Sequence, residues 1–132
     1  MRRVLVDTNV IISALLFPNS TPAAALINVL SNERLVLTEW IIAELHEVIS
    51  RKRPDLEVPL ELFLAGIDYE TALAIPSGER IADKDDQPIL DAAIASRVEV
   101  ILTGDRHFLA LDLPSPAIMT PRAYLDSFPA AD

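Results

Sequence analysis

Residues 3–10 read Arg3-Val4-Leu5-Val6-Asp7-Thr8-Asn9-Val10, a short apolar run that stops at a carboxylate. A second run, VEVILTGD over residues 98–105, has the same form and ends at Asp105. Short apolar runs bounded by turn residues predict buried β-strands. The two stretches therefore predict two central strands, each followed by an aspartate.

Helical patterns separate these apolar runs. Pro22 suits the first turn of one helix, and Thr38 is a suitable N-cap for another. Strands that alternate with helices predict an α/β domain with a mostly parallel sheet. The predicted strands cover residues 4–6, 35–37, 98–102 and 117–119. The predicted helices cover residues 23–30, 39–50 and 60–73, and two further helices start at 85–88 and at 121. Residues 10–16 form an apolar segment.

The composition fits one globular domain over residues 1–132. The chain is 51% hydrophobic with a mean hydropathy of +0.31, which argues against disorder. The absence of cysteine excludes disulfides, thiolate zinc sites and a cysteine nucleophile. The apolar run at the N-terminus is too short for a signal peptide, and no run approaches the ~18 residues of a membrane span. We expect a cytoplasmic protein.

The charge is acidic, with 11 Lys and Arg against 20 Asp and Glu and a net charge of −9. This balance argues against unspecific binding to polyanions. It remains compatible with a nucleic-acid enzyme, because acids gathered to hold cations would contribute to the same excess.

Four acids stand where an α/β fold places its ligands. Asp7 and Asp105 follow predicted strands, and parallel sheets bind ligands at the carboxyl ends of strands. Glu44 lies at the edge of the apolar stripe of helix 39–50, where a carboxylate needs a partner. Asp86 lies at a helix start, on the inward face. Each acid also has a purely structural explanation. Asp7 and Asp105 could be solvated loop residues, Glu44 could reach solvent past the core, and Asp86 could cap its helix.

Convergent carboxylates repel one another, so such a cluster needs protons or cations. Oxygen ligands suit Mg²⁺ or Mn²⁺ rather than zinc. One or two such ions can activate water and stabilise the leaving oxygen of a phosphodiester. The cluster therefore indicates phosphodiester hydrolysis without a protein nucleophile.

The same residues resemble a known family. The stretch VLVDTNV (4–10), the mid-helix Glu44, DKDDQPIL (83–90) and LTGDRHF (102–108) are similar, in order and over nearly the whole chain, to the PIN domain. The similarity extends to the branch of toxin components of toxin–antitoxin systems. The resemblance implies an α/β/α sandwich and a metal-dependent ribonuclease that hydrolyses RNA, with a cognate antitoxin and a homodimeric state.

Carried over by position, the resemblance implies an acidic metal site with hydrogen-bond support from two polar side chains. The run 83–86 leaves open which of its aspartates is the third acid. The implied catalytic and metal-binding acids are Asp7, Glu44, Asp86 and Asp105, with Asp83 as a further metal-site acid and Asn9 and Thr103 as supporting residues.

Few cations are available to hold RNA. Arg106, next to Asp105, is the first candidate for a phosphate contact, and Arg80 and Lys84 are further candidates. The cluster 51–53 ends a predicted helix, where cations commonly interact with the helix dipole. His46 and His107 are too few and too far apart in sequence to predict a metal site, and Trp40 fits the edge of the core better than a stacking platform.

Three other readings compete with the nuclease. Haloacid-dehalogenase-like phosphotransferases need an aspartate where Asn9 stands, and response-regulator receivers need a lysine late in the chain, after Lys84. A non-catalytic PIN-like domain that binds protein or RNA remains as the alternative, although such a domain would have no need for all four acids.

Overall fold

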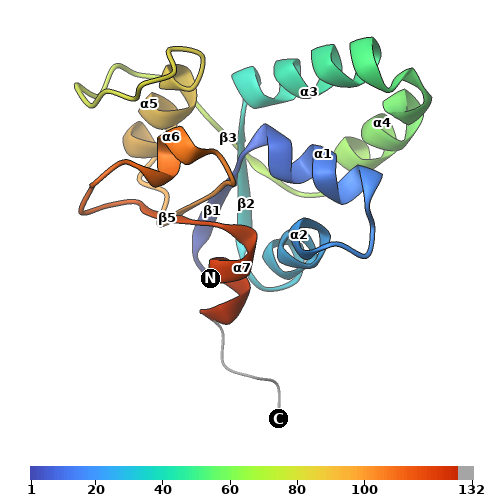
Figure 1. Ribbon diagram of the computed structural model, residues 1–132, viewed down its shortest axis with the longest axis horizontal. Coiled ribbons are helices and arrows are strands. Elements are labelled where there is room, and N and C mark those ends of the chain that lie inside the picture. Colours follow the sequence, from blue (N-terminus) through green and yellow to red (C-terminus); the bar gives the residue numbers. More distant parts are fainter. Residues whose placement is uncertain (128–132) are drawn as a thin grey trace.

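A computed structural model describes residues 1–127; residues 128–132, which the predicted single domain includes, lie outside the described residues. Its centre is a five-stranded sheet in the order β3-β2-β1-β4-β5 (Figure 1). Every neighbouring pair is parallel, so all carboxyl ends lie at one edge. The strands are β1 (Arg3–Val6), β2 (Arg34–Thr38), β3 (Glu70–Ala72), β4 (Val100–Leu102) and β5 (Ala117–Met119).

Helices cover both faces of this sheet. Figure 1 shows α1 to α4 on one side and α5 and α6 on the other. The predicted three-layer α/β/α architecture is confirmed. The helices are α1 (Thr8–Leu16), α2 (Thr21–Asn32), α3 (Glu39–Lys52), α4 (Glu57–Gly66), α5 (Gln87–Ala95), α6 (Arg106–Leu109) and α7 (Pro121–Asp126), with the 3₁₀ turn η1 (Pro54–Leu56) before α4.

The core lies on β1 and its two neighbours. Val4 pairs with Leu35 on one side and with Val100 on the other. All three residues are buried, as are the other apolar residues of these strands. Strands buried on both faces read as continuous apolar runs, which explains why they are visible in the sequence.

The prediction of one helix over residues 60–73 is wrong in its second half. Helix α4 ends at Gly66, and residues 70–72 form the edge strand β3, with Glu70 opposite Val36. Glu70 also forms an ion pair with Arg3, with 3.0 Å between Glu70 Oε2 and Arg3 Nε. Pairing with β2 and with this arginine, far away in sequence, overrides the local apolar pattern.

Other predicted elements differ from the structure only in where they begin or in whether they are helical. The apolar segment 10–16 belongs to helix α1, which starts at Thr8 with Asp7 as its N-cap. Strand β4 is shorter than the predicted 98–102, because it begins at Val100. Thr38 caps α3 as predicted, and its hydroxyl accepts from the Ile41 N–H at 2.9 Å.

Among the described helices, none is by itself long and apolar enough to cross a membrane. The pair α1 and α2, bent by 110°, passes that test together by length and composition only.

Candidate metal centre

Asp7 stands at the carboxyl end of β1 and is 3% exposed. Its backbone N–H donates to the Leu102 carbonyl at 2.9 Å, so the residue is still held in the ladder with β4. Its Oδ1 accepts from the Thr8 N–H and its Oδ2 from the Thr103 hydroxyl, both at 2.8 Å. Burial raises the pKa of Asp7 to about 6, against the lowering effect of these two hydrogen bonds; the nearby charges of Glu44 and Asp105 raise it further.

Thr103 connects two of the acids. Its fully buried hydroxyl donates to Asp7 and accepts from the Asp105 N–H at 3.0 Å. Asp105 in turn caps the short helix α6, where its Oδ1 accepts from the His107 N–H at 2.7 Å. The turn after β4 therefore sets the position of Asp105 relative to Asp7.

Asp86 lies at the start of α5, near the same carboxyl edge of the sheet as Asp7 and Asp105. It is the N-cap residue of α5, but its side chain makes no capping hydrogen bond. Burial raises the pKa of Asp86 to about 7, and the charges of Asp105, Asp7 and Asp83 add to the effect. The geometry therefore does not support helix capping as the explanation for this residue.

His107 joins the cluster through its imidazole. Its Nδ1 lies 3.2 Å from Asp105 Oδ1 and 4.0 Å from Asp86 Oδ2. Ligand atoms of Asp83, Asp86 and His107 all lie within 4.8 Å of one another. Sequence reasoning did not single out His107 for a metal site, yet the structure places its ring beside these acids. His46 is exposed on α3.

Glu44 reaches the site from α3. It is half-buried at the edge of the apolar face that Ile41, Leu45 and Ile49 form, as the helical periodicity predicts. Its charge acts on Asp7, which places the two carboxylates near one another. The ends of β1 and β4, the middle of α3 and the start of α5 therefore carry acids whose charges act on one another. Among the described residues, the ligand atoms that lie within 4.8 Å of one another are those of Asp83, Asp86 and His107.

A divalent cation fits this arrangement. Asp86 Oδ2 and His107 Nδ1 are both shielded from solvent and have no hydrogen-bond partner within the described residues. Such atoms are costly unless a donor or a cation satisfies them. Carboxylate oxygens with one imidazole nitrogen suit Mn²⁺ at least as well as Mg²⁺.

Two of the predicted residues lie outside this group. Asn9 is exposed on α1 and makes no side-chain hydrogen bond within residues 1–127. Asp85 is exposed, and its N–H donates to Asp83 Oδ1 at 2.9 Å. Within the run 83–86, Asp83 and Asp86 are the aspartates that reach the cluster.

The predicted phosphate contacts Arg106, Arg80 and Lys84 are exposed around the start of α6 and before α5. The cations at the end of α3 have local partners instead: Arg51 pairs with Glu47 at 2.7 Å and Arg53 with Asp55 at 2.7 Å.

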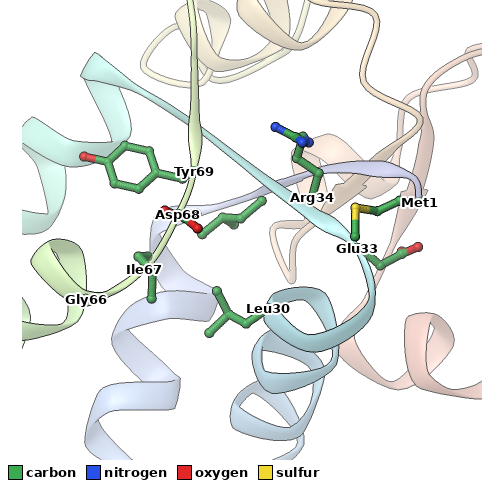
Figure 2. A pocket seen from close by; sticks show the side chains of 9 residues that line it. Met1, Leu30, Glu33, Arg34, Gly66, Ile67, Asp68 and Tyr69 are labelled. Atoms are coloured by element: carbon green, nitrogen blue, oxygen red, sulfur yellow. The ribbon is translucent and has the colours of Figure 1, made fainter.

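A cavity of the described part of the chain lies elsewhere. It measures about 680 Å³, and none of the clustered acids lines it. Figure 2 shows its side chains, which come from the end of α2, the start of β2 and the segment before β3, together with Met1. These positions are at the amino edge of the sheet, opposite the acids.

The chain is similar to known proteins in sequence pattern and in fold. Residues 3–107 match a family model described as the PIN domain. The chain belongs to the PIN domain family. A solved structure with a similar fold is the crystal structure of VapBC2 from Rickettsia felis bound to a DNA fragment from their promoter. The match has a TM-score of 0.70 and 18% identity, covering 89% of this chain and 98% of that one. Among curated protein sequences, none matches the chain.

The sequence contained a weak signal for the residue that sequence analysis missed. His107 follows Asp105 by two positions, so a turn after β4 can place both side chains at the same edge. What separates His107 from a surface histidine is the approach of α5, which brings Asp86 and Asp83 to its ring. That approach depends on packing between segments about twenty residues apart.

Proposed function

We propose that this PIN domain is a metal-dependent endoribonuclease that hydrolyses RNA phosphodiester bonds. The observation that carries the proposal is the convergence of Asp7, Asp86 and Asp105, with Glu44 beside them, at a partly buried edge. Such a group of carboxylates at neutral pH calls for a cation among them. Catalytic centres of this kind commonly act on phosphodiesters.

Asp7, Glu44, Asp86 and Asp105 would hold the cation, and Asp83 and His107 are further candidate ligands. A bound Mg²⁺ or Mn²⁺ supplies an activated water and neutralises charge on the phosphate. Thr103 and the Thr8 N–H keep the Asp7 carboxylate in one orientation, so little reorganisation is required when the cation binds. Arg106 is positioned at the rim to contact a phosphate of the RNA.

Proton release accompanies metal binding in this scheme. Because burial raises the pKa values of Asp7 and Asp86 to about 6 and about 7, both carboxyls are partly protonated just below neutral pH. A cation must displace those protons. The affinity for Mn²⁺ should therefore rise with pH through the pKa values of both groups and level off at about pH 8.

The proposal extends to a toxin of a toxin–antitoxin pair, with a cognate antitoxin protein and a homodimeric state. The likeness in fold to VapBC2 supports it. So does the acidic edge, to which a basic segment of a partner protein is complementary. Coexpression with the protein encoded next to this chain, followed by co-purification, tests the partner.

The catalytic proposal is tested with purified wild type, Asp7→Asn, Asp86→Asn and Asp85→Asn proteins. We expect wild type to bind Mn²⁺ by calorimetry and to cleave single-stranded RNA in a reaction that EDTA stops. Asp7→Asn and Asp86→Asn should lose both properties. Asp85→Asn is the matched control: it removes one exposed carboxylate from the same run and should behave as wild type.

Two results would count against the nuclease. Cleavage by Asp7→Asn at the wild-type rate would show that the activity belongs to a contaminant or to another site. Tight Mn²⁺ binding by wild type without cleavage of any RNA would favour the non-catalytic interaction domain instead.

A further inference from the structure

A second cavity, of about 340 Å³, opens at the carboxyl edge of the sheet. Its walls are mostly apolar: Trp40 and Ala43 come from α3, Leu73 and Ala74 follow β3, and Pro88 belongs to α5. Its volume lies within the range of about 300–1,000 Å³ that small-ligand sites occupy. Two of its large apolar side chains remain open to solvent, since Trp40 is 44% and Leu73 is 64% exposed.

Three separate links place this cavity beside the acidic cluster. Leu5 pairs with Val36, so Thr38, which lines the cavity, is level with Asp7 on the next strand, about 4.8 Å away. Trp40 precedes Glu44 by four residues on α3, which puts the two side chains on one face of the helix. Pro88, finally, follows Asp86 by two residues.

The chemistry of the cavity suits a flat and uncharged group. Its lining includes one acid, Glu39, and no cation, so an anion is disfavoured inside. A nucleobase carries no charge, presents a flat face and stacks on aromatic side chains. It is also joined through one ribose to the phosphate that the neighbouring acids would bind through their cation, so base and phosphate can occupy adjacent sites at once.

We propose that this cavity binds one unpaired nucleobase next to the cleaved phosphodiester, with Trp40 as the stacking surface. The proposal rests on the ribonuclease function proposed above and names its substrate class more closely: single-stranded RNA with an unstacked base beside the cut. Proteins that recognise RNA by sequence commonly bind unpaired bases in this way. Trp40 then contributes to substrate binding and to the choice of cleavage position.

A double-mutant cycle between protein and RNA tests the proposal. The substrate is an RNA that wild type cleaves, and each nucleotide next to the cut is replaced in turn by an abasic one. We expect one abasic substitution to lower kcat/KM by about 5- to 150-fold in wild type, the range for the loss of one stacked base. The Trp40→Ala variant should show a similar loss on intact RNA and no further loss on the abasic RNA.

The controls separate stacking from folding. Trp40→Phe, which keeps an aromatic face, should retain most of the activity, and Leu73→Ala should lose part of it. Phe17→Ala removes an exposed aromatic side chain at the far end of α1 and should act as wild type. Calorimetric binding of Mn²⁺ should be the same in Trp40→Ala and in wild type, because Trp40 is not a metal ligand.

Trp40 is the only tryptophan of the chain, so its fluorescence reports on this cavity. With Mn²⁺ present, adenosine 5′-monophosphate should quench the emission, whereas ribose 5-phosphate, which lacks the base, should not. Equal responses to the two compounds would overturn the proposal, as would multiplicative effects of Trp40→Ala and the abasic substitution. If wild type cleaves no RNA, the nuclease function itself is overturned. If wild type is active but Trp40→Ala and the abasic substitution do not depend on each other, only the base-binding cavity is overturned.

Discussion

Asp7 both caps helix α1 and belongs to the acidic cluster. Its Oδ1 satisfies the Thr8 N–H at the helix start, while its Oδ2 is held by Thr103. Burial in this position disfavours the ionised form, which raises the pKa of Asp7 to about 6 from its ordinary 3.8. Without a cation, the folded protein therefore carries a cost for keeping this group charged.

We expect this cost to appear as a pH dependence of stability in EDTA. A carboxyl with a raised folded pKa binds its proton more tightly in the folded state. The stability it contributes is present below pH 4 and is lost as the pH rises to about 6 for Asp7 and about 7 for Asp86. Asp7→Asn should remove the Asp7 part of this decline, so its stability should fall less than that of wild type between pH 4 and pH 8. Urea unfolding of both proteins at pH 4, 6 and 8 is the measurement, and parallel pH profiles would contradict the expectation.

Thr103 is a positioning residue for two acids. Replacing it with valine keeps the shape but removes the donor to Asp7 and the acceptor for the Asp105 N–H. Since residues that hydrogen-bond to metal-binding side chains commonly contribute about 10- to 100-fold to metal affinity, we expect Thr103→Val to weaken Mn²⁺ binding by about that factor. Loss of the Thr103 hydrogen bond should also raise the pKa of Asp7 further.

Calorimetric titration of Mn²⁺ at several pH values measures both effects. Thr103→Ser, which retains the hydroxyl, serves as the control and should stay near wild type. An unchanged affinity in Thr103→Val would show that the backbone alone holds the two carboxylates in place.

At the scale of elements, helix α3 carries both Glu44 and Trp40. It begins directly after β2, carries Trp40 in its first turn and places Glu44 one turn further on. The start of the helix is fixed by Thr38, a buried residue whose hydroxyl accepts from the Ile41 N–H. The position of α3 relative to β2 therefore determines where Glu44 stands.

Thr38→Ala should destabilise the fold by about 1–2 kcal/mol, because it removes an N-cap at a buried helix start. We also expect weaker Mn²⁺ binding, since the first turn of α3 then frays and Glu44 is less well placed. Urea unfolding and calorimetry measure the two effects. Thr38→Ser keeps the cap, so its stability and its affinity for Mn²⁺ should both be close to those of wild type. A serine variant as unstable as Thr38→Ala would instead indicate that the threonine methyl group is what stabilises the fold.

At the scale of the whole molecule, a buried ionic network joins the two ends of the described chain. Glu33, at the end of α2, accepts from Arg2 Nε at 3.1 Å and from the Tyr124 hydroxyl at 3.1 Å. The Arg2 guanidinium also lies 5.8 Å from the centre of the Tyr124 ring. Helix α7 is thereby attached to β1 and α2 at the amino edge of the sheet, far from the acids.

Tyr124→Phe removes one hydrogen bond to a buried carboxylate and leaves the ring in place. Hydrogen bonds to charged groups contribute about 1.5–3 kcal/mol, so we expect a loss of stability of about 2 kcal/mol. RNA cleavage at a temperature well below unfolding should be unchanged, because the network lies at the opposite edge. Urea unfolding and a cleavage assay on the same preparation check both halves, and a lower kcat would reveal coupling between the two edges.

The parts of the fold that were predictable are those with local causes. The apolar runs of β1 and β4 and the capped helix α3 are recognisable because burial and capping leave regular patterns in short stretches. The apolar pattern predicts helix at the edge strand β3, because Glu70-Thr71-Ala72 becomes a strand only through pairing with β2 and contact with Arg3. Asp85 and Asp86 could not be told apart for the same reason: their local sequences are nearly equivalent, and packing decides which one faces the cluster.

Local sequence was enough to predict the α/β class, a mostly parallel sheet and the edge at which the acids lie, because strand ends and acids are contiguous in the chain. Which groups share the site depends on packing between distant segments. That packing leaves Asp86 without a capping hydrogen bond, brings His107 Nδ1 to 4.0 Å from Asp86 Oδ2, and leaves Trp40 44% exposed. The physical reason is distance. Hydrogen bonding and burial within a few residues leave a pattern in the sequence, whereas repulsion, desolvation and shared ligands act between segments that meet only when the sheet has formed.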